Sequence, residues 1–172
     1  MASEIQIRAF LPAEAAAVRE LFIQVNRLLA PAHLAEAFEG YITRSLAEEI
    51  DRLADYYASR NGSFWVAVDD DEIGGMLGLE ASGERTMELR RMYVAPGARR
   101  RGIARKMLAF AEEECRRRNR PELQLSTSEL QQDALVLYRN AGYENVREEI
   151  ADATSNKTLG GGIRRYYFTK RL

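Results

Sequence analysis

The feature that most constrains the fold of this chain is the segment MYVAPGARRRGIAR, residues 92–105. The residues before it, from about 86 to 94, read as a strand that Ala-Pro-Gly ends. The residues after it place apolar side chains at helical spacing to about position 118. A strand that leads through a short basic loop into a long amphipathic helix indicates a mixed α/β fold.

Length and composition limit the other possibilities. The chain has 172 residues, which predicts a single domain over residues 1–172. Its sequence contains no apolar run of the roughly 20 residues that a membrane span needs, and its start does not resemble a secretory signal. A lone cysteine, Cys115, cannot form an internal disulfide, which favours a cytoplasmic location. One cysteine and one histidine cannot build a His/Cys metal site, so we expect no metal.

Hydrophobic periodicity predicts the remaining elements. Gly74, Gly75 and Gly78 lie in a predicted strand and would let a neighbouring backbone come close. The predicted strands cover about residues 3–9, 64–68, 73–80, 86–94, 123–127, 143–150 and 164–170. The predicted helices cover about residues 12–30, 100–118 and 130–140. A further predicted helix begins somewhere in residues 41–45 and ends at about residue 59.

Charge is divided unevenly along the chain, although the formal net charge is only −1. Residues 1–80 carry 6 basic and 14 acidic side chains, whereas residues 81–172 carry 19 basic and 12 acidic ones. Such a split is compatible with a basic surface that binds nucleic acid. Because the basic residues are not interleaved with aromatic ones except near the C-terminus, nucleic acid is the less favoured partner.

The loop and helix start at residues 99–105 form a candidate anion site. A helix N-terminus presents four unpaired N–H groups and about half a positive charge. Gly102 has no side chain to block an anion from this backbone, and Ala104 is nearly as small. The pattern predicts a cradle for a pyrophosphate, and it is neither a P-loop nor a dinucleotide fingerprint. Positive charge comes from four arginines around it, Arg99, Arg100, Arg101 and Arg105.

These residues resemble the signature of a known family. Arg99-x-x-Gly102-x-Ala104 is similar to the Q/R-x-x-G-x-G/A motif of the GNAT superfamily of N-acetyltransferases, which binds the pyrophosphate of acetyl-coenzyme A. The strand ELRRMYV at 88–94 resembles the fourth strand of that family, and ALVLYRNAGY at 134–143 resembles one of its helices. The resemblance implies an α/β GNAT fold, with a mixed, mostly antiparallel sheet flanked by helices and splayed between its fourth and fifth strands.

The resemblance also implies how the chain would bind acetyl-coenzyme A, the one cofactor expected and a co-substrate. Pantetheine would pair with the backbone of Met92, Tyr93 and Val94. Gln131 stands where many members carry an asparagine, and it can still form a hydrogen bond. The pyrophosphate would meet the N–H groups of the cradle, from Arg100 through Arg101, Gly102, Ile103 and Ala104 to Arg105.

Two residues resemble the family's acid and base. Tyr138 matches the general acid that protonates the coenzyme A thiolate, although a core tyrosine would show the same apolar spacing. Glu88 lies at the spacing of the glutamate base of histone-acetylating members, although an ordinary salt bridge to Arg90 explains it equally well. Less supported alternatives for the base are Tyr93, Tyr41 and Glu80.

The acceptor is constrained least. The family's acceptor walls correspond here to residues 26–62 and to the loop 151–162, which is either a lid or disordered. Acidic residues in the first wall favour a cationic acceptor, such as a polyamine, an amino sugar, a lysine or a peptide N-terminus, unless they only solvate a helix. These acids are Glu36, Glu39, Glu48, Glu49, Asp51 and Asp55.

Taken together, the residues and the resemblance predict an N-acetyltransferase. It would transfer acetyl directly, in a ternary complex, from acetyl-coenzyme A to a primary amine of a small molecule, a protein or a peptide. The alternative is a non-catalytic acyl-coenzyme A sensor that keeps the cradle without turnover. The aromatic last strand, at residues 166–168, is either core or the edge of a homodimer.

Overall fold

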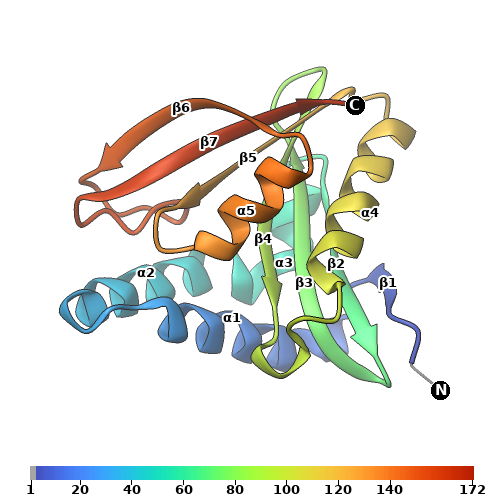
Figure 1. Ribbon diagram of the computed structural model, residues 1–172. Helices are drawn as coiled ribbons and strands as arrows, with labels where there is room; N and C mark the ends of the chain where they lie inside the picture. Colours follow the sequence, from blue (N-terminus) through green and yellow to red (C-terminus); the bar gives the residue numbers. More distant parts are fainter. Residues whose placement is uncertain (1–2) are drawn as a thin grey trace.

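The computed structural model describes residues 3–172 and is built on one seven-stranded sheet (Figure 1). Its spatial strand order is β1-β2-β3-β4-β5-β7-β6, and all neighbours are antiparallel except the parallel pair β4–β5. The predicted α/β fold with a mostly antiparallel sheet is therefore confirmed. The strands are β1 (Gln6–Ala9), β2 (Ser63–Asp69), β3 (Glu72–Ala81), β4 (Thr86–Val94), β5 (Glu122–Ser128), β6 (Glu144–Ala151) and β7 (Ile163–Arg171).

Helices cover both faces of this sheet. Alternate residues of β2 enter the two cores, with Phe64 and Val66 packed among α1–α3, and Trp65 and Ala67 packed with α4 and α5. Within residues 3–172, no helix combines the length and the apolar character that a membrane crossing requires. The helices are α1 (Ala15–Leu29), α2 (Ala35–Glu48), α3 (Leu53–Ala58), α4 (Ile103–Arg117) and α5 (Gln132–Asn140), with short turns η1 (Pro12–Glu14), η2 (Ala32–Leu34), η3 (Ile50–Arg52) and η4 (Pro96–Ala98).

Two glycines of β3 let helices pack closely on the sheet. A Cβ built on Gly75 would lie 3.0 Å from Sδ of Met107 on α4. A Cβ built on Gly78 would overlap the hydroxyl of Tyr57, a residue of α3 that is 1% exposed. The sequence predicted a close approach of backbone at these glycines, and the structure places side chains there instead.

The strands β4 and β5 pair only where they begin. The paired residues are Thr86 with Glu122, Met87 with Leu123, and Glu88 with Gln124, and beyond them the two strands diverge (Figure 1). β4 stays paired with β3 as far as Val94. From position 89 onward, the β5-facing edge of β4 therefore has no strand partner within residues 3–172, and the predicted splay is confirmed.

The second predicted helix starts earlier than its pattern indicated, and it is interrupted. It was expected to begin at about residues 41–45, but α2 begins at Ala35. Its first turn lies in an alanine-rich stretch whose weak apolar pattern hides the helical period. The interruption falls at Glu49, where φ of −139° and ψ of −61° leave the helix and the side chain turns into the interior.

The last strand is not an edge of the sheet. β7 lies between β5 and β6, and its Phe168 is 1% exposed in the core packed by α4 and α5. The alternative in which residues 166–168 form a dimer edge is therefore wrong, because β6 is the edge strand on that side.

We predict that Gly78→Ala destabilises the protein, since its methyl group overlaps the hydroxyl of Tyr57. Adding a carbon to a packed core typically costs about 1–3 kcal/mol, which a urea titration should show as a lower free energy of unfolding. The matched control is Gly40→Ala on the exposed side of α2, where the new Cβ meets no atom of the described residues within 4 Å. This control should raise stability by about 0.5–1 kcal/mol, and similar effects of the two variants would contradict the packing described here.

Candidate functional site

An irregularity in β4 organises the candidate site. Neighbouring residues of a strand normally point to opposite faces, yet Arg90 and Arg91 both reach Glu49. The register of β3 and β4 shifts between Met76 and Gly78, and Arg91 has φ of 54°, so a β-bulge turns its side chain. Nη2 of Arg90 donates to Oε1 of Glu49, and Nε of Arg91 donates to Oε2 over 2.6 Å.

This ion cluster is buried. Glu49 is 0% exposed, and Arg90 and Arg91 are each 7% exposed. Burial by itself would raise the pKa of Glu49, but the Arg91 and Arg90 guanidinium groups outweigh burial and hold the pKa below its usual range. The carboxylate is therefore ionised at neutral pH and neutralises part of a charge that would be very unfavourable if left unpaired.

Arg91 joins three parts of the chain. Besides Glu49, it donates from Nη1 to the hydroxyl of Tyr41 on α2 over 2.6 Å. It also donates from Nη2 to the carbonyl oxygen of Asn156 over 2.5 Å. Asn156 belongs to the loop 152–162 between β6 and β7, so the bulge ties this loop to the sheet and to α2.

A cavity of about 100 Å³ lies where β4 and β5 part. Residues of both strands, of α5 and of the loop 152–162 line it. Six of the residues singled out from the sequence meet there, namely Tyr41, Glu88, Met92, Tyr93, Gln131 and Tyr138. The separation of the strands thus gives the candidate acid, the candidate base and part of the candidate cofactor strand one shared space.

Glu88 reaches this cavity already paired with cations. Its Oε2 lies 3.0 Å from Nζ of Lys157, and its Oε1 lies 3.8 Å from Nη1 of Arg90. Its side chain is 16% exposed. The sequence left a salt bridge to Arg90 open as the alternative to a base, and the structure shows that contact together with Lys157 as the nearer partner.

Tyr138 belongs both to the core and to the cavity. It is 6% exposed, and its ring packs against Tyr143 with the centroids 5.9 Å apart. Burial, and to a smaller extent Tyr93, raises the pKa of Tyr138 above its ordinary value. The phenol therefore keeps its proton at neutral pH, as a proton donor must.

The weaker candidates for the base are less suited to it. Burial raises the pKa of Tyr93 to about 12, so this residue is a neutral phenol at physiological pH. The hydroxyl of Tyr41 accepts a hydrogen bond from Arg91. Glu80 is 6% exposed and lies 3.3 Å from Nζ of Lys157, and it does not line the cavity as Glu88 does.

α4 begins as the cradle pattern predicted. Gly102 is its N-cap, with φ of 76°, a conformation that favours glycine. A Cβ on Gly102 would meet no atom of residues 3–172 within 4 Å, which leaves space among these residues beside the first N–H groups of the helix. Val94 lies at the end of β4, just before this segment. The geometry is that of an anion site at a helix N-terminus.

The side chains of the cradle are not equivalent. Arg101 forms an ion pair with Asp69 and donates to Oγ of Ser3 over 3.2 Å, so it is directed toward the end of β2. Ile103 is 2% exposed in the core, which leaves only its backbone for a ligand. Ala104 is partly buried, whereas Arg99, Arg100 and Arg105 are exposed. In the described part of the chain, none of residues 99–105 lines the cavity between β4 and β5.

Gln131 immediately precedes α5 as its N-cap residue. Its Oε1 accepts a hydrogen bond from Oγ1 of Thr127 over 2.9 Å, so the end of β5 already uses its side-chain carbonyl. Its position in the cavity lining is compatible with the cofactor contact that the sequence predicted.

The acidic residues that favoured a cationic acceptor are directed elsewhere. Within residues 3–172, none of these six acids lines the cavity, and Glu88 is the one carboxylate that does. Glu49 is buried against two arginines. Three others form exposed pairs, Glu39 with Arg27, Glu48 with Arg44 and Asp51 with Arg19. The acids of residues 26–62 therefore give no support to a cationic acceptor.

Sequence reasoning did not single out Arg91 or Lys157, and it placed Glu49 in the wall of an acceptor site rather than in a buried ion cluster. Two successive arginines in an otherwise apolar strand were an available signal, because charged side chains are almost never fully buried unless they are paired. No comparable signal marked Lys157, since only the tertiary contacts of the loop 152–162 bring it to Glu88.

Comparisons with known proteins agree with this geometry. Residues 27–143 match a family model described as the acetyltransferase (GNAT) family. The chain is 33% identical over 98 residues to the probable N-acetyltransferase 14 of Xenopus tropicalis, covering 56% of this chain and 48% of that protein. It is 29% identical over 100 residues to the uncharacterized N-acetyltransferase YjgM of Escherichia coli K12, covering 56% and 60%. The matched region thus spans about half the length of these relatives.

Solved structures share the fold. The PaiA N-acetyltransferase of Thermoplasma acidophilum, in complex with coenzyme A, superposes with a TM-score of 0.74 at 18% identity over 98% of this chain and 99% of that chain. A GNAT-family acetyltransferase of Staphylococcus aureus Mu50 gives 0.73 at 21% identity over 95% and 98%. At these identities the similarity concerns the fold.

We predict that Glu49→Gln destabilises the protein by about 3–5 kcal/mol at pH 7, because it leaves two buried arginines without a counter-charge. The pKa of Glu49 is lowered in the folded state, so its contribution is present above the ordinary carboxyl pKa and is lost as pH falls through the lower, folded value. The difference between wild type and variant, measured by urea unfolding, should therefore shrink in acid.

The neighbouring Glu48→Gln is the matched control. Glu48 is exposed and pairs with Arg44 on the surface of α2, so its loss should change stability by less than about 1 kcal/mol. Equal decreases in the free energy of unfolding of the two variants would show that Glu49 does not stabilise the fold more than an exposed glutamate does.

Proposed function

The chain belongs to the acetyltransferase (GNAT) family, and on this premise we propose that it transfers an acetyl group from acetyl-coenzyme A to a primary amine of a small molecule, a protein or a peptide. The transfer is direct, within a ternary complex. The observation that carries the proposal is the parting of β4 from β5, because it gives Glu88, Tyr138 and an unpaired strand edge access to one cavity.

In this proposal, the strand edge and the cradle hold the two ends of the cofactor. The amides of pantetheine need hydrogen-bond partners, which the backbone of β4 at Met92, Tyr93 and Val94 offers in the manner of an added strand. The pyrophosphate reaches the start of α4, where Gly102 leaves room. Arg99, Arg100 and Arg105 add charge, and Arg101 contributes through its backbone since its side chain pairs with Asp69.

The proposed chemistry uses the two groups at the cavity. Glu88 accepts a proton from the acceptor ammonium, and the freed nitrogen attacks the thioester carbonyl carbon. A backbone N–H of residues 92–94 stabilises the negative charge that develops on the carbonyl oxygen. The carbon–sulfur bond breaks, and Tyr138 gives its proton to the thiolate. The second proton of the nitrogen restores Tyr138, and the proton on Glu88 is released to solvent.

The test is release of free thiol from acetyl-coenzyme A over a panel of amines. We predict amine-dependent release that Tyr138→Phe slows by about a hundredfold or more, with binding of coenzyme A retained. Because the pKa of Tyr138 is raised, loss of its proton should not reduce the rate below pH 10, the ordinary value for a tyrosine.

Tyr143→Phe is the matched control for Tyr138→Phe. Tyr143 packs against Tyr138, and its buried hydroxyl has no hydrogen-bond partner within residues 3–172. It does not line the cavity, so this variant should keep full turnover. Binding of coenzyme A without thiol release on any amine would favour the alternative of a non-catalytic sensor.

A separate prediction concerns the cradle. Coenzyme A at about 100 times its Kd should stabilise the protein by about 2.7 kcal/mol, seen as a higher melting temperature. Gly102→Glu should abolish that shift, because its carboxylate would occupy the space of the phosphates. Gly83→Glu is matched in its positive φ and open surroundings, and it lies in the turn before the other end of β4. Gly83→Glu should retain the rise in melting temperature with coenzyme A. If Gly102→Glu also retained that rise, coenzyme A would bind at another place.

A further inference from the structure

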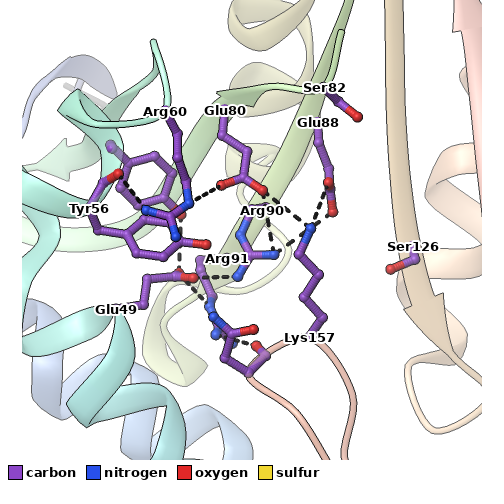
Figure 2. A network of polar contacts seen from close by, with 12 residues as sticks. Glu49, Tyr56, Arg60, Glu80, Ser82, Glu88, Arg90, Arg91, Ser126 and Lys157 are labelled. Carbon is purple, nitrogen blue, oxygen red and sulfur yellow. Dashed lines mark hydrogen bonds and ion pairs between the residues drawn. The ribbon is translucent and has the colours of Figure 1, made fainter.

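Lys157 is the nearest amine to the proposed base. Its Nζ lies 3.0 Å from Oε2 of Glu88 and 3.3 Å from Oε1 of Glu80 (Figure 2). Lys157 lines the same cavity as Glu88, Met92 and Tyr138. A primary amine of the chain itself therefore lies where the proposed function needs the amine of an acceptor.

The position of Lys157 is set by contacts of its loop. The carbonyl of Asn156, the preceding residue, accepts the hydrogen bond from Arg91, and the carbonyl of Thr154 accepts one from Arg44 over 2.9 Å. Leu159, two residues further on, is 7% exposed and packs in the core with α1–α3. These anchors on both sides direct Lys157 toward β4, while its side chain keeps an exposure of 47% and stays reachable by a second reactant.

The two carboxylates beside Lys157 differ in how many other cations approach them. Glu80 is also approached by Arg60 at 3.5 Å and by Arg90 at 3.8 Å, whereas Glu88 has only Arg90, at 3.8 Å, besides Lys157 in the described part of the chain. Glu88 is thus the carboxylate more dependent on Lys157, and the one placed to take its proton.

We propose that Lys157 is a self-acetylation site, which the protein modifies in cis with acetyl-coenzyme A. This inference rests on the proposed function, since it uses the same cavity, base and acid. Nζ gives one proton to Glu88 and attacks the carbonyl carbon of the thioester, so a carbon–nitrogen bond forms and the carbon–sulfur bond breaks. Tyr138 protonates the leaving thiolate, and the proton that the nitrogen then loses restores Tyr138. The products are an amide at Lys157, free coenzyme A and one released proton.

Acetylation changes the contacts that hold the loop. An amide at Nζ carries no charge, so the ion pairs of Lys157 with Glu80 and Glu88 are lost. Glu88 then lacks its nearest cation, while the Arg91 and Arg44 contacts of the loop involve backbone carbonyls and are unaffected. The modification therefore frees the base without releasing the whole loop.

The experiment is peptide mass spectrometry of the protein after incubation with acetyl-coenzyme A. The sequence contains three lysines, so Lys106 and Lys170 report chemical acetylation within the same sample. Both are themselves held by contacts, Lys106 by the carbonyl of Ile5 and Lys170 by Glu112. We expect Lys157 to be acetylated at least tenfold faster than the other two, with a first-order rate constant that does not change with protein concentration.

Two variants and one parallel assay keep the outcomes distinct. Glu88→Gln should slow labelling of Lys157 to the rate of the other lysines, and Lys157→Arg should leave no rapidly labelled site. Thiol release with external amines is followed on the same preparation.

Amine-dependent release of thiol without acetylation of Lys157 would overturn this inference and leave the proposed function standing. Equal acetylation of all three lysines would do the same. An apparent first-order rate constant that rises in proportion to protein concentration would overturn modification in cis. Failure to bind coenzyme A at all would overturn the proposed function.

Discussion

The structure depends on one buried carboxylate that accepts hydrogen bonds from two successive arginines of a strand. Glu49 is fully buried, and its two oxygens receive Arg90 and Arg91. Regular strand geometry cannot direct two neighbouring residues to one group, so this contact and the bulge with φ of 54° at Arg91 require each other. An unpaired charge at this depth would be strongly destabilising, which makes the break between α2 and η3 at Glu49 part of the same arrangement.

The features of the candidate site lie around this cluster. The bulge belongs to the part of β4 that has left β5, where the strand edge is unpaired and the cavity lies. Arg91 also fixes the loop 152–162 through Asn156, which brings Lys157 to Glu88. A structural ion cluster thus positions the candidate base, its nearest amine and the open strand edge, while α5 supplies Tyr138 from the other side.

Much of this arrangement was predictable from the sequence, and what was missed has a common physical cause. Local signals sufficed for β4 and for Gly102 at the start of α4, because turn residues and a short motif carry them. The parting of β4 and β5 was implied by the resemblance to the GNAT family. The partners of Glu49 and the position of Lys157 depend on contacts between residues 40 or more positions apart, which periodicity does not encode. The start of α2 was hidden by the weak apolar pattern of its alanine-rich first turn. The acids of residues 26–62 suggested a cationic acceptor although none of them lines the cavity, because a sequence does not show which carboxylates are buried and which are exposed. The single domain and the residue roles stay predictions.

The central claim is that the gap between β4 and β5 is the acetyl-coenzyme A site. A crystal structure of the protein grown with coenzyme A tests it most directly. The account predicts pantetheine along β4 at residues 92–94, with the pyrophosphate at Gly102 and the thiol directed toward Tyr138. Coenzyme A bound at any other surface, with the cleft between β4 and β5 closed by side chains, would contradict it.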